Sequence, residues 1–506
     1  MIKLLTLILI VFSLSCNSLT GFSQDSVELT FIHWNDFHAA NSPYEIKPSK
    51  QDTFTSYFVA GAAYFKGYID SLKKVNKNPI TVFAGDEFQG SPISGMTRGQ
   101  SQMDIITKIK TDVLTLGNHE FDYSDERVFD LISKTDLNYI SANVYSKKTD
   151  TTLVKPYFIM EKAGLTIAFI GGMTDEFLDV SLPTNLKNTY QKKIIPTLRN
   201  TINVIKSKGI KPDLWIAVTH NGVEEDKVLA KEVPDFDIII GGHSHTYLPI
   251  EEHVGKTLIV QAGYRGRYIG ELKVNYSRNT SSISTFSYKL IETRNSNITP
   301  DKELTEIVKK QEAFVGKSLD EVIGELKIDW KVPLTGESNL GSFETDAFRE
   351  KAGTDIAFTN NGGLRKEMVA GPVKVKDIWE INPFNNTLVT IDVKGKEIPG
   401  MLKYTFEKAE SFNQVSGLKI RAKKLGVRQY DFLEILVNGK PIENEKIYSV
   451  VMNNYMGLQM KRIFGLDPET HPLTYLDAID KDVVIEKIRK VKIIDQEVDG
   501  RIVIEE

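Results

Sequence analysis

Cysteine, basic charge and long apolar segments are scarce in this chain, and each scarcity excludes a class of protein. The 506 residues include one cysteine, so no intramolecular disulfide can form and the folded state must be stabilised in other ways. A formal net charge of -4 provides no basic footprint for a nucleic acid polymer. The N-terminal apolar stretch, Leu4 to Leu14, is too short to span a bilayer.

The rest of the composition is that of an ordinary globular protein, with 41% hydrophobic and 26% charged residues. A chain of 506 residues exceeds the size, roughly 250 to 300 residues, at which a single core stops growing. Strand-like and helix-like patterns alternate along the sequence, which is typical of α/β proteins. We therefore expect an α/β protein with two or more domains.

The N-terminus has the pattern of a secretory signal. Lys3 precedes the apolar stretch, and small residues near Gly21-Phe22-Ser23 suit cleavage, which predicts a signal peptide over residues 1–24. Ser13-Leu14-Ser15-Cys16 also resembles a bacterial lipoprotein signal, which would end at residue 15 and leave Cys16 acylated. Both alternatives place the mature protein in the periplasm or secreted, and the second anchors it to the outer membrane.

Histidine is scarce as well, and its distribution is uneven. Five of the eight histidines lie in short polar fragments that closely follow apolar runs. If the runs (29–32, 80–84, 113–116, 214–218 and 238–240) are strands, the fragments lie at strand ends, where open α/β sheets build their sites. We expect structural roles for the other three, His33, His253 and His471. The fragments are Asp36-Phe37-His38, Gly85-Asp86, Gly117-Asn118-His119-Glu120, Thr219-His220-Asn221 and Gly241-Gly242-His243-Ser244-His245.

The side chains of these fragments suit divalent metal ions. They offer carboxylate, imidazole and amide groups without a thiolate, a set that zinc, manganese and iron accept. Seven candidates are too many for one tetrahedral ion, whereas two ions that share Asp86 would use all of them. Paired ions of this kind clamp the attacking and leaving oxygens in phosphate ester hydrolysis. The candidates are Asp36, His38, Asp86, Asn118, His220, His243 and His245.

The same fragments carry a family resemblance. Asp-x-His, Gly-Asp-x-x-Gln-Gly-Ser (85–91), Gly-Asn-His-Glu-Phe-Asp (117–122), Thr-His-Asn-Gly and Gly-His-Ser-His resemble the motifs of calcineurin-like metallophosphoesterases. Within that superfamily, the mature chain resembles the two-domain 5′-nucleotidases, which include bacterial periplasmic nucleotidase/UDP-sugar hydrolases. The resemblance implies a four-layer α/β/β/α sandwich and a smaller α+β substrate-binding domain, joined by a helix.

The resemblance also implies roles for individual residues. His119 and Asp122 match a catalytic dyad, in which the carboxylate fixes the imidazole tautomer and favours its cation. Two positions depart from the family pattern: Ala39 stands where many relatives have Gly, and His245 where some have Gln or Asn. The implied ligands are Asp36, His38, Asp86 and His245 for one metal, and Asp86, Asn118, His220 and His243 for the other.

The domain boundary is expected near residue 300. Ser277 to Thr285 is rich in Ser, Asn and Thr, and from Pro300 apolar residues recur at helix spacing, with Asp301 favouring the helix start. We expect a catalytic domain over residues 25–295, a linker helix over residues 300–318 and a C-terminal substrate-binding domain over residues 320–506.

Two C-terminal segments resemble the substrate-binding segments of the family. In Asn361-Gly362-Gly363-Leu364-Arg365, the arginine would bind phosphate or carboxylate through its planar fork. In Asn382-Pro383-Phe384-Asn385-Asn386, the phenylalanine would stack on a base. Asn361 and Asn386 would be polar contacts, and Tyr455 is the candidate for the second face of a base sandwich.

Other positions of this domain depart from the family. Glu337-Ser338 stands where many relatives place an Arg before the segment matched by Asn339-Leu340-Gly341, so one phosphate clamp is expected to be missing. Met456-Gly457-Leu458 follows Tyr455 in place of Gly-Gly-Asp-Gly, so an acidic loop residue is absent. These departures concern the choice of substrate rather than the metal chemistry.

We expect a secreted dinuclear-metal phosphoesterase that hydrolyses nucleoside 5′-monophosphates or related small nucleotides, and not a nucleic acid polymer. Two alternatives use the same centre on a different ester, namely a 2′,3′-cyclic phosphodiesterase and a UDP-sugar hydrolase. An alternative of another class is a surface protein that binds nucleotides without turnover. The complete ligand set and the His119 and Asp122 pair argue against that last alternative.

Overall fold

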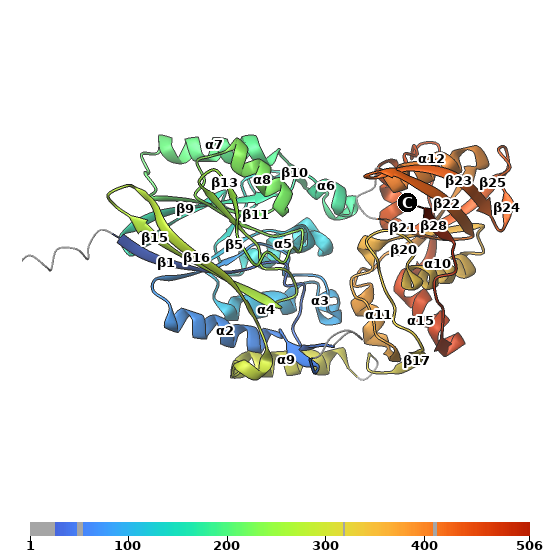
Figure 1. Cartoon of the computed structure of the whole chain (residues 1–506), viewed down its shortest axis with the longest axis horizontal. Coiled ribbons are helices and arrows are strands. Elements are labelled where there is room, and N and C mark those ends of the chain that lie inside the picture. Colours follow the sequence, from blue (N-terminus) through green and yellow to red (C-terminus); the bar gives the residue numbers. More distant parts are fainter. Residues whose placement is uncertain (1–25, 48–53, 317–318, 408–411, 506) are drawn as a thin grey trace, which may run out of the picture.

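The computed structural model of the chain describes residues 26–47, 54–316, 319–407 and 412–505. These residues form an N-terminal and a C-terminal lobe that lie side by side (Figure 1). The predicted signal segment, including Cys16, lies outside the described residues. None of the helices in the described ranges is long and apolar enough to cross a bilayer.

Two six-stranded sheets form the centre of the N-terminal lobe. The first sheet contains, in spatial order, β16 (Ser282–Glu292), β15 (Tyr268–Ser277), β1 (Ser26–Trp34), β4 (Pro79–Phe83), β5 (Val113–Thr115) and β6 (Tyr139–Ile140). The second contains β13 (Glu252–Val254), β14 (Thr257–Val260), β12 (Ile238–Gly241), β11 (Leu214–His220), β9 (Leu165–Met173) and β8 (Tyr157–Lys162). The four neighbouring strands from β1 to β6, and those from β14 to β9, are parallel. The five apolar runs that precede the polar fragments are thus confirmed as strands.

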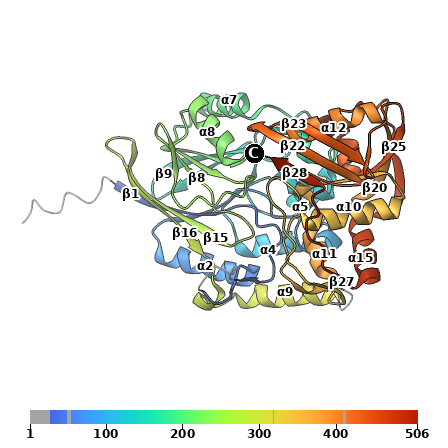
Figure 2. The ribbon, with the colours of Figure 1, turned by 45° about the vertical axis from the view of Figure 1, so that its right-hand side comes forward.

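Helices cover the outer face of each sheet, as Figures 1 and 2 show. Along β1, Phe31 points into the core between the two sheets, where its ring lies 6.5 Å from that of Phe169. The next residue, Ile32, points to the opposite face and packs in the core under the helices. The four-layer α/β/β/α sandwich is therefore confirmed. The main covering helices are α2 (Ala62–Val75), α4 (Gln100–Ile109) and α5 (Asp125–Ser133) on one side, and α7 (Ile194–Ser207) and α8 (Val223–Glu232) on the other.

Shorter elements surround the sandwich. They are β2 (Tyr44–Ile46), β3 (Tyr57–Val59), α3 (Pro92–Thr97), the 3₁₀ helix η1 (Asn118–Tyr123), β7 (Val144–Ser146), α6 (Phe177–Val180), the 3₁₀ helix η2 (Pro183–Asn185), β10 (Thr189–Gln191) and the 3₁₀ helix η3 (Asn295–Asn297).

Helix α9 (Lys302–Val315) lies in the range expected for the linker. Asp301 caps its N-terminus, because the carboxylate accepts a hydrogen bond from the backbone N–H of Leu304 at 2.8 Å. The Ser-, Asn- and Thr-rich segment from Ser277 to Thr285 lies within the range predicted for the catalytic domain. This segment contains the tight turn between β15 and β16, which pair as an antiparallel hairpin, so it belongs to the first sheet.

The C-terminal lobe is an α+β domain with three sheets. A five-stranded sheet has the order β21 (Asn413–Ser416), β18 (Ile356–Asn360), β25 (Ile447–Asn453), β20 (Thr387–Lys394) and β26 (Thr474–Ile479). A four-stranded sheet contains β24 (Lys440–Pro441), β23 (Gln429–Val437), β22 (Leu418–Gly426) and β28 (Ile502–Glu505). A three-stranded sheet contains β19 (Gly371–Lys374), β17 (Val322–Leu326) and β27 (Ile493–Ile494).

Adjacent residues of β18 point to two different cores of this lobe, Ala357 to one and Phe358 to the other. The alternation follows from the two-residue period of a strand. The helices that cover these cores, with two short 3₁₀ helices, are α10 (Asn339–Ala352), η4 (Asn361–Gly363), α11 (Val375–Ile381), η5 (Gly395–Glu397), α12 (Ile398–Glu407), α13 (Asn454–Leu458), α14 (Met460–Phe464) and α15 (Asp480–Val491).

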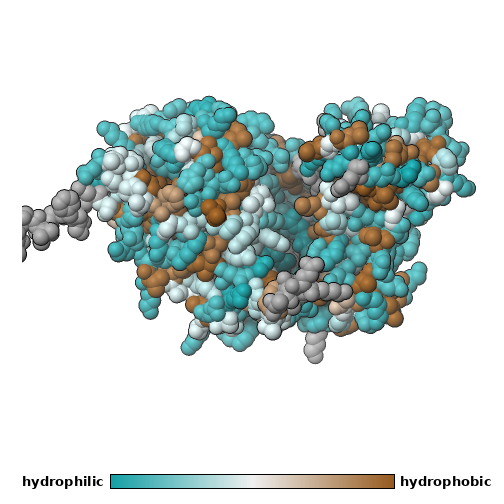
Figure 3. Space-filling model, in the orientation of Figure 1, coloured by the Kyte–Doolittle hydropathy of each residue, from teal (hydrophilic) through white to brown (hydrophobic). Residues whose placement is uncertain are grey.

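The two lobes contact each other beside a hollow that is visible in the space-filling view (Figure 3). Gln459, between α13 and α14, donates its side-chain amide to the backbone carbonyls of Asp179 and Ser181. The hydroxyl of Tyr455 lies 3.4 Å from the same carbonyl oxygen of Asp179. Residues of the C-terminal lobe are therefore held against the end of α6, close to the strand ends of the N-terminal lobe.

Candidate metal centre and substrate cleft

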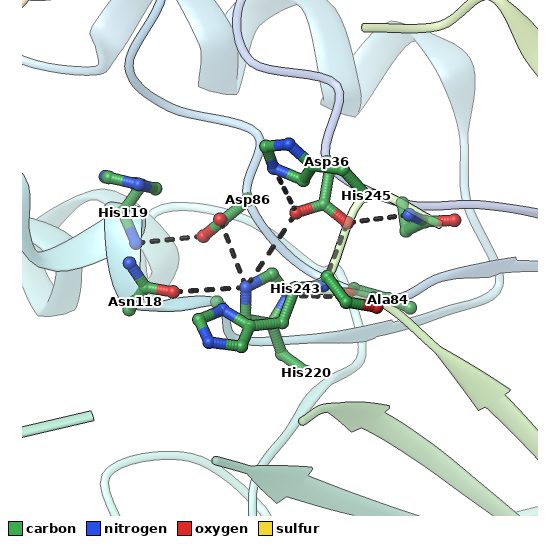
Figure 4. A network of polar contacts seen from close by, with 12 residues as sticks. Asp36, Ala84, Asp86, Asn118, His119, His220, His243 and His245 are labelled. Carbon is green, nitrogen blue, oxygen red and sulfur yellow. Dashed lines mark hydrogen bonds and ion pairs between the residues drawn. The ribbon is translucent and has the colours of Figure 1, made fainter. Parts of the chain in front are cut away.

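The polar fragments converge at the carboxyl ends of the parallel strands. Asp36 follows β1, Asp86 follows β4, His220 ends β11, and His243 follows β12. Figure 4 shows the side chains of Asp36, Asp86 and His220 pointing toward one another. Asp36 and His220 are fully buried, and Asp86 is 1% exposed. Residues up to 209 positions apart in the sequence, from 36 to 245, are therefore brought together by the two sheets.

The first group of ligand atoms consists of Asp36, His38 and His245, whose donor atoms lie within 4.8 Å of one another. The Nε2 atoms of His38 and His245 are 2.9 Å apart. Asp36 Oδ1 lies 3.2 Å from His245 Nε2 and 3.7 Å from His38 Nε2. Two imidazole nitrogens and one carboxylate oxygen thus surround a common point.

The second group consists of Asp36, Asp86 and His220, also within 4.8 Å. His220 Nε2 lies 3.1 Å from Asp86 Oδ2 and 3.2 Å from Asn118 Oδ1. The ring of His243 lies 4.9 Å, between centroids, from the ring of His220. All seven residues that the sequence predicted as ligands therefore lie together. The predicted assignment shares Asp86 alone, whereas the structure places a carboxylate oxygen of Asp36 near both groups as well.

The buried polar atoms of these groups fit divalent cations. Asp36 Oδ1 is buried and accepts no hydrogen bond from the residues that the structure describes. Burial raises the pKa of Asp86, but the imidazoles of His220 and His119 lower it more, so it lies well below its usual range. Buried charges are stable in proteins when they are paired or coordinate metals. Ionised carboxylates, imidazoles and one amide oxygen therefore form a His/Asp cluster that is consistent with a dinuclear metal site.

The backbone of the centre adopts conformations that are rare for residues with side chains. Asp36 has φ 49°, Asp86 has φ 65° and His243 has φ 81°, all in the left-handed region. Each such residue costs on the order of 1 to 3 kcal/mol, and such residues cluster at functional sites. The sharp turns direct the side chains of three strand ends into the same space.

Two glycines allow the close approach of these turns. A Cβ at Gly117 would collide with the carboxylate and backbone nitrogen of Asp86. A Cβ at Gly242 would lie 2.5 Å from the carbonyl oxygen of Ala84 and 3.0 Å from His220 Nδ1. Any larger residue at either position would displace a candidate ligand.

Glu120 has a structural role that the sequence did not predict. Its buried carboxylate accepts hydrogen bonds from the backbone N–H groups of Asp86, Glu87 and Gly117, at 3.0, 2.7 and 2.5 Å, and from Phe88 at 3.3 Å. These bonds fix the loop that carries Asp86. The sequence shows Glu120 only as an acidic residue directly after Asn118 and His119. An exposed glutamate could stand at the same position, so the sequence does not reveal this role.

The His119 side chain lies at the edge of the centre, beside the cleft. Its Nδ1 lies 2.8 Å from Asp122 Oδ2, three residues on in η1, and its backbone N–H donates to Asp86 Oδ1 at 2.9 Å. Burial lowers the pKa of His119, but the carboxylates of Asp122 and Asp86 raise it more, so the net change is upward. The structure thus places a carboxylate beside His119, in an arrangement that favours the imidazolium.

A cleft of about 490 Å³ joins this centre to the C-terminal lobe. Its lining includes His119 and Asp122 from one lobe and four of the predicted substrate-binding residues from the other, which are Arg365, Phe384, Asn386 and Tyr455. The Arg365 guanidinium reaches the metal centre, with Nη2 3.4 Å from His38 Nε2. The cleft therefore connects the predicted base-binding residues to the predicted ligands.

Asn361 is placed differently from the other predicted substrate-binding residues. Its side-chain amide donates to the carbonyl of Pro333 at 2.9 Å, and its side-chain oxygen accepts from Gln414 at 2.9 Å. The residue lines two neighbouring cavities rather than the main cleft. Its polar atoms thus hold the loop before Arg365 in this structure.

The three remaining histidines lie away from the centre. His33 is fully buried, with its ring stacked 5.8 Å from that of Tyr288, and burial lowers its pKa to about 3. His253 is half exposed and lies 3.2 Å from Glu251, and His471 lies 3.4 Å from Glu397. These contacts agree with structural roles.

Comparison with known proteins identifies the family of the two lobes. Residues 29–247 match the calcineurin-like phosphoesterase family, and residues 322–463 match the 5′-nucleotidase C-terminal domain. The chain belongs to the 5′-nucleotidase family. The protein is therefore a phosphoesterase hydrolase, and its His/Asp cluster is that of a metallophosphoesterase.

Relatives with different names match this chain at similar sequence identities. Endonuclease YhcR of Bacillus subtilis is 26% identical over 506 residues, a match that covers 93% of this chain and 41% of that protein. The 5′-nucleotidase of Vibrio parahaemolyticus is 26% identical, over 85% of this chain and 81% of that protein. The crystal structure of a 5′-nucleotidase precursor from Thermus thermophilus has a TM-score of 0.86 and 25% identity, covering 95% of this chain and 99% of that chain. This chain thus spans less than half of the endonuclease.

Proposed function

We propose that this 5′-nucleotidase-family enzyme hydrolyses nucleoside 5′-monophosphates to nucleoside and phosphate. The observation that carries the proposal is the single cleft in which His119 faces Phe384 across the two lobes. Its volume of about 490 Å³ lies within the range, roughly 300 to 1,000 Å³, of small-molecule sites. A nucleotide in this cleft would have its phosphate at the strand ends and its base at the C-terminal lobe.

The phosphate end would be bound by the seven candidate ligands through two divalent ions, for which zinc, manganese and iron are suitable. Such ions, when bound, supply Lewis acidity and make water a competent nucleophile near neutral pH. The proposed ligands are Asp36, His38, Asp86 and His245 for one ion and Asp86, Asn118, His220 and His243 for the other.

His119 would stabilise the negative charge that develops on the phosphoryl oxygens. Its Nδ1 is engaged with Asp122, so Nε2 is the nitrogen that remains to donate a proton or a hydrogen bond. Asp122 holds the ring in this tautomer and favours its cation. Removal of one preorganised donor of this kind typically costs about 10² to 10³ in rate.

The C-terminal lobe would bind the nucleoside. Phe384 offers an aromatic face at the cleft, and stacking contributes about 1 to 3 kcal/mol per base. Asn386 and Tyr455 line the same cleft and would contact the ribose or the base. Arg365 lies between this region and His38, where its guanidinium can donate to phosphate oxygens.

A substrate panel with protein reconstituted in manganese or zinc tests the proposal. The panel contains AMP, other nucleoside monophosphates, UDP-glucose, 2′,3′-cyclic AMP and an aryl phosphate. We expect the highest kcat/KM for a nucleoside 5′-monophosphate and loss of turnover after chelation. A clear preference for the cyclic ester or the UDP-sugar would replace the proposed substrate, and full activity without metal would exclude the dinuclear mechanism.

We also propose that the enzyme acts outside the cytoplasm, on the basis of the signal pattern at residues 1–24. Mass spectrometry of the mature N-terminus after expression in a bacterial host distinguishes the two processing alternatives. A diacylglyceryl adduct on Cys16 indicates a lipoprotein, an N-terminus near residue 25 indicates a secreted form, and an intact Met1 contradicts both.

A further inference from the structure

A second, smaller cavity adjoins the metal centre. It has a volume of about 180 Å³ and shares His245, Gly362 and Arg365 with the main cleft. Its wall also includes His38, Gln89 and Arg265 of the N-terminal lobe. The cavity is below the roughly 300 Å³ at which nucleoside-sized ligands are usually bound, so a compact group suits it better than a base.

Arg265, which lines this cavity, carries an unsatisfied donor. Its Nε is buried and has no hydrogen-bond partner among the residues that the structure describes, while its guanidinium lies 5.2 Å from the Tyr44 ring. The residue is fixed at its backbone, with φ 55° and a 2.7 Å hydrogen bond from its N–H to the carbonyl of Asp36. A buried charged donor without a partner is costly, and an anionic acceptor would remove that cost.

Gln89 supplies a second unsatisfied donor. Its side chain is 2% exposed, and its Nε2 has no hydrogen-bond partner within the described ranges. It lies three residues after Asp86 with φ 62°, so the same left-handed loop that directs Asp86 also places Gln89 at the cavity. The N–H₂ group of the Gln89 amide can donate to an anion. It cannot pair with the guanidinium groups of the arginines, because those groups also only donate.

The charge balance of the cavity favours an anion. Among the described residues that line it, Glu380 is the one acid, and Lys366 lies 2.6 Å from the Glu380 carboxylate. Burial raises the pKa of Glu380, but Lys366 and Arg265 lower it more, so the acid is ionised and neutralised. Two arginines, Arg265 and Arg365, thus line the cavity beside a single lining acid that already has a lysine partner.

The contacts of Glu337 also bear on which residues can bind an anion at this site. The sequence predicted that a phosphate clamp of the C-terminal lobe is missing at Glu337-Ser338. The Glu337 carboxylate accepts hydrogen bonds from the backbone N–H groups of Asp499 and Gly500 at 2.8 and 2.9 Å, and Arg501 lies 3.9 Å away. It is thus engaged within its own lobe. Arg265 brings a second guanidinium to the site from the opposite lobe.

We propose that the small cavity is a second anion subsite, in which Arg265, Arg365 and Gln89 bind a phosphate dianion. Arginine forks match phosphate oxygens bidentately, and the Gln89 amide would add a third donor direction. Two sources can supply this anion: the inorganic phosphate that hydrolysis releases, and a second phosphoryl group of a nucleoside diphosphate. The subsite rests on the proposed function for its substrate, and extends it to nucleotides with more than one phosphate.

Calorimetric titration of inorganic phosphate into manganese-loaded protein tests the first source without turnover. We expect two phosphates per wild-type chain, one at the metal centre and one in the subsite, and one per chain in Arg265→Met. Arg278→Met removes the same charge from the exposed β15–β16 turn of the same lobe and should leave two. Unchanged manganese content in both variants shows that the centre is intact.

The kinetics of AMP and ADP test the second source. If the subsite binds a phosphoryl group of the substrate, Arg265→Met should raise the KM for ADP about tenfold or more, as expected for loss of a charged hydrogen bond, and change the KM for AMP less than twofold. A lost phosphate or a selective rise in the KM for ADP supports the subsite. Neither change in Arg265→Met overturns it. Absence of nucleotide hydrolysis would instead contradict the proposed function, while the phosphate titration stays interpretable.

Discussion

The ring of His119 lies 5.9 Å, between centroids, from the ring of Phe384, and the two residues belong to different lobes. Neither lobe alone therefore brings this imidazole and an aromatic face together. The arrangement of the two lobes in the structure joins the predicted chemistry of one lobe to the predicted recognition of the other.

Phe384→Ala should weaken nucleotide binding selectively. Loss of about 1 to 3 kcal/mol of stacking predicts a rise in the KM for AMP of roughly 5- to 150-fold. Steady-state kinetics with AMP and with glycerol phosphate, which has no ring, measure the effect. Phe129→Ala, at a half-exposed phenylalanine of α5, is the matched control. An equal loss with both substrates would show that Phe384 supports the fold of the cleft instead of stacking on the base.

His119→Ala should reduce kcat about 10² to 10³ and leave the metal content unchanged, because its side chain is not among the proposed ligands. Asp122→Asn should give a smaller loss, since the imidazole stays in place and loses only its carboxylate partner. Rates measured at saturating substrate, together with metal analysis of each variant, separate catalysis from metal binding. His253→Ala changes a surface histidine and should behave like wild type. If His119→Ala retains full kcat, the proposed dyad is wrong.

Metal analysis of ligand variants should distinguish a shared ligand from a terminal one. In the proposed assignment Asp86 binds both ions, so Asp86→Ala should lose most of both. His245→Ala should retain about one ion per chain, because the ligands of the second site remain. Inductively coupled plasma mass spectrometry of protein dialysed against buffer gives the two stoichiometries. Equal retention in both variants would remove the shared role of Asp86.

Glu344→Gln should make the C-terminal lobe more stable at high pH. Burial raises the pKa of Glu344 to about 7, whereas an unfolded glutamate has a pKa of about 4.3. Between these values the folded state binds more protons than the unfolded state, so stability declines as pH rises from about 4 to 7 and stays low above that. Burial likewise raises the pKa of Asp480 to about 6, which acts in the same direction.

The neutral amide at position 344 removes this decline. In the wild type, the Glu344 carboxylate accepts hydrogen bonds from Thr359 at 2.9 Å and from Asn382 at 3.2 Å. A glutamine amide can accept one of these bonds through its oxygen and donate the other through its nitrogen. Urea denaturation at pH 4 and pH 8 should give nearly equal unfolding free energies for variant and wild type at pH 4, and a gain on the order of 3 kcal/mol for the variant at pH 8. Glu469→Gln, at an exposed site, should show no such difference. A variant that is less stable than wild type at pH 8 would contradict the argument.

The strand-end fragments were predictable because their signal is local. Each apolar run forms a buried strand, and parallel strands place their carboxyl ends at one edge, so Asp36 and Asp86 had to come close in the first sheet. His220 ends a strand of the second sheet, and its approach to them depends on how the two sheets pack. The segment from Ser277 to Thr285 contains a hairpin turn of the first sheet, and its Ser, Asn and Thr residues are common both in such turns and in interdomain linkers, so composition alone could not tell the two apart.

The role of Arg265 was not predictable in this way. Its proximity to Gln89 depends on how the two sheets pack, and its proximity to Arg365 depends on how the two lobes meet. Neither arrangement leaves a periodic pattern in the sequence. The hydrogen bonds of Asn361 could not be predicted for the same reason, since its partners Pro333 and Gln414 lie on other segments of the chain.

The contact of Gln459 with Asp179 and Ser181 is chemically one-sided. Both acceptors are main-chain carbonyls, which every amino acid possesses, whereas the donor is a single side chain. Substitutions at positions 179 and 181 that keep the backbone path would leave the acceptors in place, and substitutions at 459 would delete the donor. A single substitution at position 459 would therefore remove both of these hydrogen bonds between the lobes without touching any group of the metal centre.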